Sequence, residues 1–175
     1  MEIKNDRLVN FLKEIDKELE RDIKLHAVGG TAMTLLGLKT STLDIDFDMN
    51  DADLTELERI LKSTPHGFKV DLYKNGLIFS QQLPKDYVSK LILIPADLMR
   101  IKLYALNPVD IVVTKIGRLN DRDIQDIESC IKKHTLKKAA IINRAKQVVY
   151  IGREETYEEN LRFVIKKFFK YKGSP

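Results

Sequence analysis

Residues 43–49 read Leu43-Asp44-Ile45-Asp46-Phe47-Asp48-Met49 and alternate strictly between apolar and acidic side chains. Because successive side chains of a β-strand point to opposite faces, this pattern predicts a strand whose four apolar residues face a core. The three aspartates would share the other face, where like charges repel one another. A divalent cation offsets that repulsion directly, because Mg²⁺ takes carboxylate oxygens as ligands. An acidic, solvent-facing edge strand that deters aggregation would show the same pattern, so the alternation alone leaves both interpretations open.

A glycine pair lies upstream of this strand, between two predicted elements. Lys24–Val28 reads as a short strand and Thr31–Leu38 as a short helix, with Gly29-Gly30 at their junction. Glycine lets backbone approach a ligand closely, and N–H groups at a helix start attract phosphate. The pair on its own would equally suit an ordinary tight turn. Together with the aspartates of the next strand, it predicts a phosphate cradle beside a metal-binding carboxylate pair.

The remaining pattern predicts an α+β fold with a mixed sheet and flanking helices. Helical spacing of apolar residues indicates one helix up to about Arg21 and another over Asp53–Ser63, capped by Asp51 or Asp53. Asn75-Gly76 is a strong hairpin signal between two strands. The strands expected after the second helix are Phe68–Tyr73, Leu77–Ser80, Lys90–Ile94 and Met99–Ala105.

From Pro108, which suits a first helical turn, the pattern is helical to the end of the chain. Breaks near Asn120, His134 and Gly152 separate the later helices. We therefore expect residues 1–107 to form the core and residues 108–175 to form a helical region packed on it.

Composition favours a globular, cytoplasmic protein without a membrane span. Hydrophobic residues make up 43% and charged residues 32% of the 175 residues. No apolar run approaches the roughly 18 to 20 residues that a span needs, and residues 1–6 are too polar for a signal peptide. The single Cys130 excludes an intramolecular disulfide and fits a reducing compartment, where we expect it to pack within a helix.

The formal net charge is +4, and the excess of basic residues lies in the C-terminal part. These residues are Lys132, Lys133, Lys137, Lys138, Arg144, Lys146, Lys166, Lys167, Lys170 and Lys172. They form either a solvated helix face or a surface for an anionic partner such as RNA. Similarly, Tyr73, Tyr87 and Tyr104 either stack a base or pack in the core and hairpin.

The segments Val28-Gly29-Gly30 and Asp44-Ile45-Asp46 resemble the signature of the nucleotidyltransferase superfamily typified by DNA polymerase beta. That signature is a hydrophobic residue and a glycine pair, a spacer, an Asp-hydrophobic-Asp pair, and a third acidic residue on a later strand. Asp71, between Val70 and Leu72, matches the third acidic residue. The resemblance implies a nucleotidyltransferase fold, with Asp44, Asp46 and Asp71 as ligands of one or two Mg²⁺ ions.

Residues 108–127 are similar to a helical segment of small prokaryotic nucleotidyltransferase-like proteins, including the toxins of abortive-infection toxin–antitoxin pairs. In those proteins a helix lysine and an aspartate of the following Asp-x-x-Asp stretch belong to the active site. Lys115 and Asp123 take these places, and Asp126 is a further candidate. Ion pairs on a helix surface are the alternative for the same residues.

The resemblance implies transfer of a nucleoside monophosphate from a nucleoside triphosphate to an acceptor hydroxyl, with RNA or tRNA favoured as acceptor. Asp71 would help deprotonate that hydroxyl, and Lys115 would pair with the phosphates. The residues expected to hold the nucleotide are Gly29, Gly30, Thr31, Lys39 and Thr42. The relatives often carry arginine where Thr40 stands, and Lys39 is expected to supply that charge.

A cognate antitoxin protein is a further partner that the resemblance implies. Two other functions are compatible with the same residues. One is a catalytically silent nucleotidyltransferase fold that binds nucleic acid or a protein partner. The other is a structural interaction protein whose acidic strand only deters aggregation.

Overall fold

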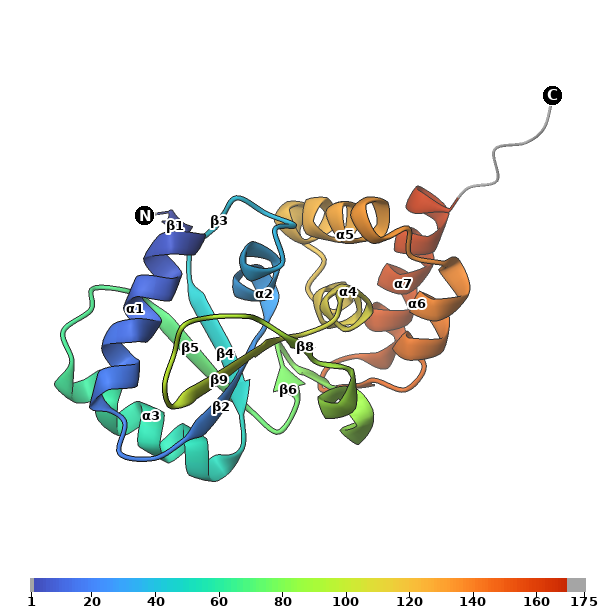
Figure 1. The fold of residues 1–175 in the computed structure, drawn as a ribbon. Helices are drawn as coiled ribbons and strands as arrows, with labels where there is room; N and C mark the ends of the chain where they lie inside the picture. The colour runs from blue at the N-terminus through green and yellow to red at the C-terminus, as the bar shows by residue number, and fades with distance from the viewer. Residues whose placement is uncertain (1, 170–175) are drawn as a thin grey trace.

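The structure of the protein is a computed structural model that describes residues 2–169 (Figure 1). Over this range the main sheet has eight strands in the order β10-β7-β6-β5-β4-β2-β9-β8. Its strands are β2 (Ile23–Ala27), β4 (Ile45–Met49), β5 (Val70–Lys74), β6 (Leu77–Ile78), β7 (Gln81–Gln82), β8 (Ile92–Leu93), β9 (Ile101–Ala105) and β10 (Val149–Tyr150). A separate pair joins β1 (Ile3–Lys4) to β3 (Ser41–Thr42).

The centre of the main sheet is mixed, as predicted. Strand β2 runs antiparallel to β4 and parallel to β9, whereas β4 runs parallel to β5. On β4, Ile45, Phe47 and Met49 are buried, which confirms the apolar face of this strand. The β4–β5 register places Asp46 directly beside Asp71. Two carboxylates from segments far apart in sequence thereby become neighbours at one place in the sheet.

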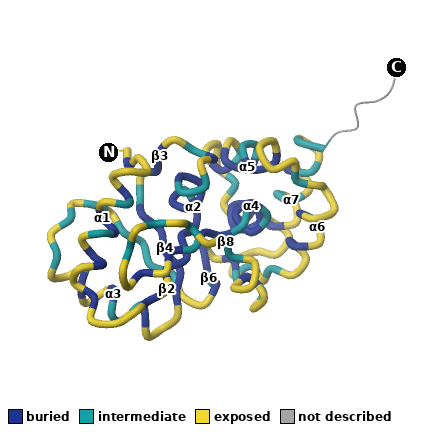
Figure 2. Tube along the Cα trace, in the orientation of Figure 1, coloured by how far each residue is buried: buried dark blue, intermediate teal, exposed yellow. Residues whose placement is uncertain are grey.

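Helices flank this sheet and gather at one end of it (Figure 1). They are α1 (Asn5–Glu18), α2 (Gly29–Leu35), α3 (Asp51–Ser63), α4 (Pro108–Ile116), α5 (Asp121–His134), α6 (Lys138–Ala145) and α7 (Glu154–Phe168), with a 3₁₀ helix η1 (Lys85–Lys90). Helix α4 contacts α2, α5, α6 and α7 and is buried along most of its length (Figure 2). The C-terminal helices are therefore organised around α4.

The predicted helix start at Pro108 and the predicted break near Asn120 are confirmed, and a capping asparagine marks each. Asn107 accepts hydrogen bonds from two backbone N–H groups at the start of α4, and Asn120 forms a capping box with Asp123 at the start of α5. Cys130 is buried on α5, as expected for a packing residue. No helix within residues 2–169 combines the length and apolar character that crossing a membrane would require.

Several boundaries correct the sequence-based expectations. Helix α3 is capped by Asn50, whose side chain accepts from the Asp53 N–H, and not by Asp51 or Asp53. Leu43 was expected in the core, but it lies in a bend before β4 and is 43% exposed. The expected strand Leu77–Ser80 ends at Ile78 because the chain turns there into β7.

The C-terminal region also departs from the expected all-helical pattern. Strand β10 pairs with β7 and extends the main sheet, so this region contributes a strand to the core. Lys170 and Lys172, counted among the basic C-terminal residues, lie outside the described residues. The division at residue 107 stays a prediction.

Candidate active site

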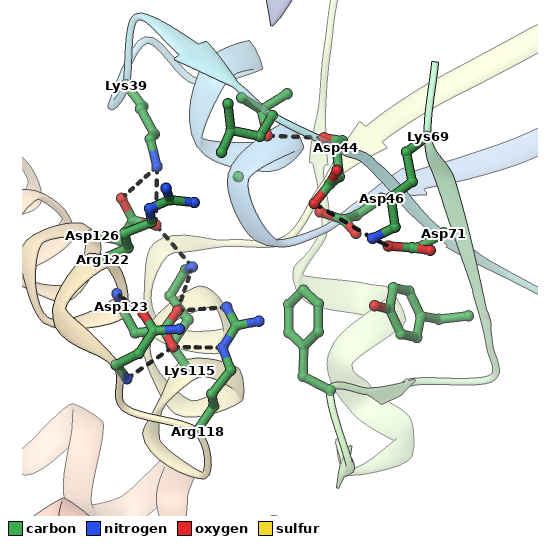
Figure 3. A pocket seen from close by; sticks show the side chains of 16 residues that line it. Lys39, Asp44, Asp46, Lys69, Asp71, Lys115, Arg118, Arg122, Asp123 and Asp126 are labelled. Atoms are coloured by element: carbon green, nitrogen blue, oxygen red, sulfur yellow. Dashed lines mark hydrogen bonds and ion pairs between the residues drawn. The ribbon is translucent and has the colours of Figure 1, made fainter. Parts of the chain in front are cut away.

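A pocket of about 230 Å³ lies where β4 and β5 face α4 and α5 (Figure 3). Nine residues that the sequence names as site candidates line it. They are Gly30, Lys39, Thr42, Asp44, Asp46, Asp71, Lys115, Asp123 and Asp126. The other lining residues are Leu43, Lys69, Tyr73, Phe79, Arg118, Asn120 and Arg122. Three separate stretches of sequence thus meet in one cavity.

One wall of the pocket is acidic. Asp46 on β4 and Asp71 on β5 are register partners, and Asp44 lies in the bend that leads into β4. The ammonium of Lys69 lies 2.6 Å from Asp71 Oδ2 and 3.5 Å from Asp44 Oδ2. Within residues 2–169, no three His, Cys, Asp or Glu side chains converge as a preformed metal site. Instead, a lysine ammonium lies between two of the three carboxylates.

Asp46 carries the clearest electrostatic signature in this wall. Burial, followed by repulsion from Asp71 and Asp44, raises its pKa from 3.8 to about 7, although Lys115 and Lys69 oppose the change. Its side chain is nearly buried, and no residue in the described range donates a hydrogen bond to its carboxylate. A cation placed here would favour the ionised form. Carboxylate oxygens are the ligands that Mg²⁺ prefers.

Asp48 does not belong to this wall, although strand alternation predicted it beside Asp44 and Asp46. Its fully buried carboxylate accepts hydrogen bonds from Tyr87 Oη at 2.6 Å and from the Gly76 N–H at 2.9 Å. His26 Nδ1 lies 3.1 Å away, and the His26 ring packs against Tyr104. Asp48 is therefore a structural carboxylate, and Tyr87 packs in the core.

The glycine pair allows α2 to approach the acidic strand closely. Gly29 has φ +53°, a left-handed conformation that favours glycine, and a Cβ there would lie 3.2 Å from Asp46 Oδ2. A Cβ at Gly30 would lie 2.5 Å from Thr42 Oγ1. The Thr42 hydroxyl donates to the Asp44 carbonyl at 2.9 Å. The glycines thus set the spacing between α2 and the segment that carries the carboxylates.

Thr31 corrects an expectation. Its hydroxyl was expected to contact a triphosphate, but the side chain is fully buried. Thr31 Oγ1 accepts the Asp46 N–H at 2.9 Å and lies 3.3 Å from the Asp44 carbonyl. The hydroxyl therefore fixes the start of β4 and does not face the pocket.

The opposite wall is a network of buried and half-exposed ion pairs. Lys115 Nζ lies 3.1 Å from Asp123 Oδ1 and 2.9 Å from Asp126 Oδ2, and its side chain is only 3% exposed. Lys39 reaches the same Asp126 at 3.0 Å, and Arg118 binds both oxygens of Asp123. Lys115 and Asp123 do form an ion pair, as the alternative expected, but the pair is buried and does not lie on a helix surface. The pocket brings Lys115 and Asp123 together as the resemblance implies.

The charges of Arg118 and Lys115 keep Asp123 ionised. Burial alone would raise its pKa, but the Arg118 hydrogen bonds and the two positive charges outweigh burial and hold the pKa below its ordinary value. The capping box with Asn120 adds a backbone hydrogen bond to the same carboxylate. Asp123 thus fixes the positions of two cations that line the pocket.

The two walls carry opposite charge, as Figure 3 shows. The helical wall contains four cations and two carboxylates: Lys39, Lys115, Arg118 and Arg122, with Asp123 and Asp126. On the sheet wall, three carboxylates face one cation, Lys69. Arg122 is exposed at the start of α5 and forms no ion pair with another described residue. The pocket therefore suits a ligand that combines a cation with a polyanion.

Lys69 and Phe79 are among the lining residues that the sequence interpretation did not assign to the site. Lys69 had a usable signal, since it lies two residues before Asp71 and strand alternation puts both on one face. Phe79 had none, because its position in the pocket depends on a turn that its residue type does not favour.

Comparisons with known proteins agree with this geometry. The chain matches the family described as "Nucleotidyltransferase of unknown function (DUF6036)" over residues 6–174. It is similar in structure to an antigenic nucleotidyltransferase-like protein from Paracoccidioides brasiliensis, with a TM-score of 0.57 and 16% sequence identity. That alignment covers 95% of this chain and 91% of the other. No curated protein matches. The family match, together with the glycine pair against an acidic strand and the buried helix lysine, leads to one conclusion. The chain belongs to this nucleotidyltransferase family and has a nucleotidyltransferase-like fold.

Proposed function

We propose that the protein is a Mg²⁺-dependent nucleotidyltransferase that moves a nucleoside monophosphate from a nucleoside triphosphate to an acceptor hydroxyl. The observation that carries this proposal is the separation of charge across the pocket. A metal–triphosphate complex carries a divalent cation beside an extended polyanion. The sheet wall matches the first part and the helical wall matches the second.

Asp44, Asp46 and Asp71 would hold one or two Mg²⁺ ions. When bound, Mg²⁺ neutralises charge on the phosphates and helps align the attacking and leaving oxygens. Asp46 would bind the metal in its ionised form, so metal binding would compete with protonation near neutral pH, where its raised pKa lies. The Lys69 ammonium, which lies between Asp44 and Asp71 on an exposed side chain, would have to leave that place for a metal to bind there.

The helical wall would hold the triphosphate. Lys115 is fixed between Asp123 and Asp126, so it presents its charge without further ordering of its side chain. Arg118 and Lys39 are each tied to one of the same carboxylates, and Arg122 adds an unpaired guanidinium at the mouth of the pocket. Three cations held by ion pairs and a fourth, unpaired one suit the many oxygens of a triphosphate.

In the reaction, the acceptor oxygen forms a bond to the α-phosphorus while the bond to the bridging oxygen breaks, and pyrophosphate leaves. Asp71 accepts the proton of the acceptor hydroxyl. It lies at the half-exposed edge of the acidic wall, where an acceptor can reach it. Positioning and electrostatics would supply most of the rate enhancement.

The test is transfer of label from each α-³²P nucleoside triphosphate to total RNA in the presence of Mg²⁺. RNA is the first acceptor to try because of the basic residues on α5, α6 and α7. We expect labelled RNA with wild type, and loss of labelling with Asp46→Asn and with EDTA. Asp97→Asn removes the same charge from an exposed site outside the pocket and should keep full labelling. Equal labelling by wild type and Asp46→Asn would refute the assignment of the site.

A further inference from the structure

Two consecutive tight turns connect β5, β6 and β7. The first has Asn75-Gly76 at its centre and joins Lys74 to Leu77, with φ values of +54° and +80°. The second has Phe79-Ser80 at its centre and joins Ile78 to Gln81, with φ values of +48° and +70°. Two-residue hairpin turns with positive φ at both central residues are of type I′.

The residues of the second turn are poorly suited to it. Type I′ turns strongly prefer Asn-Gly, which the first turn has. A bulky side chain at positive φ is a conformational outlier, and such outliers persist mainly where the surrounding structure enforces them. The chain therefore uses the favoured residues at one turn and places a phenylalanine in the same backbone conformation four residues later.

Contacts on both sides enforce the second turn. Gln81 is fully buried, and its Nε2 donates to the Phe79 carbonyl at 2.6 Å. Its Oε1 finds no hydrogen-bond partner among the described residues, which is a further cost of this arrangement. The Ser80 carbonyl accepts the Ile151 N–H at 2.8 Å, beside β10. Strand β10, at the edge of the sheet, thus helps to hold the second turn.

The result of this turn is an aromatic ring inside a highly charged pocket. Phe79 lies so close to Gly29 that a Cβ there would be 2.8 Å from Phe79 Cζ. Tyr73 meets the Phe79 ring edge to face, with centroids 5.2 Å apart, and the Arg118 guanidinium lies over the ring at 5.2 Å. All three side chains line the pocket, and Arg118 belongs to its helical wall.

We propose that Phe79 and the Arg118 guanidinium stacked over it, with Tyr73 at the edge of the ring, form the binding site for the nucleobase of the triphosphate. This inference rests on the proposed function. Every nucleobase has an apolar π-face that stacks on an aromatic ring, and a guanidinium plane stacks in the same way. The three side chains offer flat surfaces, and two of the three guanidinium nitrogens of Arg118 already donate to Asp123 rather than to a base edge. The site therefore takes all four nucleobases with modest preference.

The experiment compares calorimetric binding of Mg²⁺–ATP and Mg²⁺–tripolyphosphate, which share the phosphate chain but not the base. The double variant Phe79→Asn/Ser80→Gly gives the second turn the residues of the first. We expect a higher melting temperature and about tenfold or greater loss of ATP affinity, since base stacking has effects of this size. Tripolyphosphate affinity should stay within about twofold of wild type, because neither substitution removes a cation of the phosphate-binding wall and Arg118 keeps its hydrogen bonds to Asp123.

Two further variants serve as controls. Ser80→Gly relaxes the turn and keeps the ring, so ATP affinity should stay at the wild-type level while the melting temperature rises. Phe79→Leu keeps apolar volume but removes the π-face, so it should lose part of the ATP affinity even if the double variant folds poorly.

The outcomes separate this inference from the proposed function. If tripolyphosphate binds with Mg²⁺ but the Phe79 variants bind ATP as wild type does, the nucleobase site is wrong and the proposed function stands. If neither ligand binds wild type with Mg²⁺, the proposed function fails and this inference fails with it.

Discussion

Replacing Asp46 by asparagine should stabilise the metal-free protein at alkaline pH. Asparagine has nearly the same shape and removes the charge that burial, Asp71 and Asp44 all disfavour. The backbone N–H of Asp46 keeps its hydrogen bond to Thr31 Oγ1, because that bond does not involve the carboxylate. The substitution therefore removes a cost and leaves the local framework intact.

The size of the effect follows from the raised pKa. The interval from 3.8 to about 7, at about 1.4 kcal/mol for each pH unit, corresponds to about 4 kcal/mol at most. Salt screens the repulsion from the partly exposed Asp44 and Asp71, so we expect about 1–3 kcal/mol. A folded-state pKa above the unfolded value means that the native protein holds its proton more tightly. The contribution of the Asp46 carboxyl to the free energy of unfolding of wild type is thus highest below pH 3.8 and falls as pH rises toward 7.

The assay is thermal and urea unfolding in EDTA at pH 8.5 and pH 5. At pH 8.5 the variant should melt above wild type, by about 2–4 °C for each kcal/mol, and the difference should shrink at pH 5. Asp48→Asn is the matched control on the same strand. It should lower stability, because the Asp48 carboxylate accepts bonds from Tyr87 and Gly76 in a fully buried place. An Asp46→Asn variant no more stable than wild type at pH 8.5 would refute this electrostatic account of the acidic wall.

Three further predictions concern packing and metal dependence. Arg144→Ala should lower the free energy of unfolding by about 3 kcal/mol or more, because it leaves the fully buried Asp110 without its charged partner. Urea unfolding tests this, and the exposed control Arg162→Ala should stay within about 0.5 kcal/mol of wild type. Gly30→Ala should destabilise the protein, because the added Cβ would clash with the Thr42 hydroxyl. Adding Thr42→Ala should therefore restore part of the lost stability, and additive effects in a thermal double-mutant cycle would contradict this. Mg²⁺ should raise the melting temperature of wild type but not of Asp44→Asn/Asp46→Asn, and an equal rise in both would place the metal elsewhere.

The alternation of residues 43–49 sufficed to orient most of the central strand, because side-chain period in a strand is fixed by the backbone. It did not reveal where the strand begins, so Leu43 was assigned to a core that it does not reach. It also grouped Asp48 with the pocket carboxylates. The role of Asp48 depends on Tyr87, which lies 39 residues further along, and no local pattern carries that information.

The candidate site, like the fold, could be predicted only in part from the sequence. The glycine pair, Asp71, Lys115 and Asp123 were assigned to the site because motif and spacing carry them. The structure places Gly30, Asp71, Lys115 and Asp123 around one pocket, whereas Gly29 and Thr31, also assigned to the site, do not line it. Phe79 was missed because local propensity argues against phenylalanine in a type I′ turn. A position where tertiary structure overrides propensity is visible only once the contacts of Gln81 and β10 are known.

The most direct test of the central claim is calorimetric binding of each nucleoside triphosphate, with Mg²⁺ or EDTA, to wild type and to Asp44→Asn/Asp46→Asn. We predict that wild type binds triphosphate only with Mg²⁺ and that binding disappears in the double variant. Triphosphate binding that is the same with EDTA, or the same in the double variant, would contradict the assignment of the acidic wall. Absence of binding to wild type for all four triphosphates would contradict the proposed activity itself.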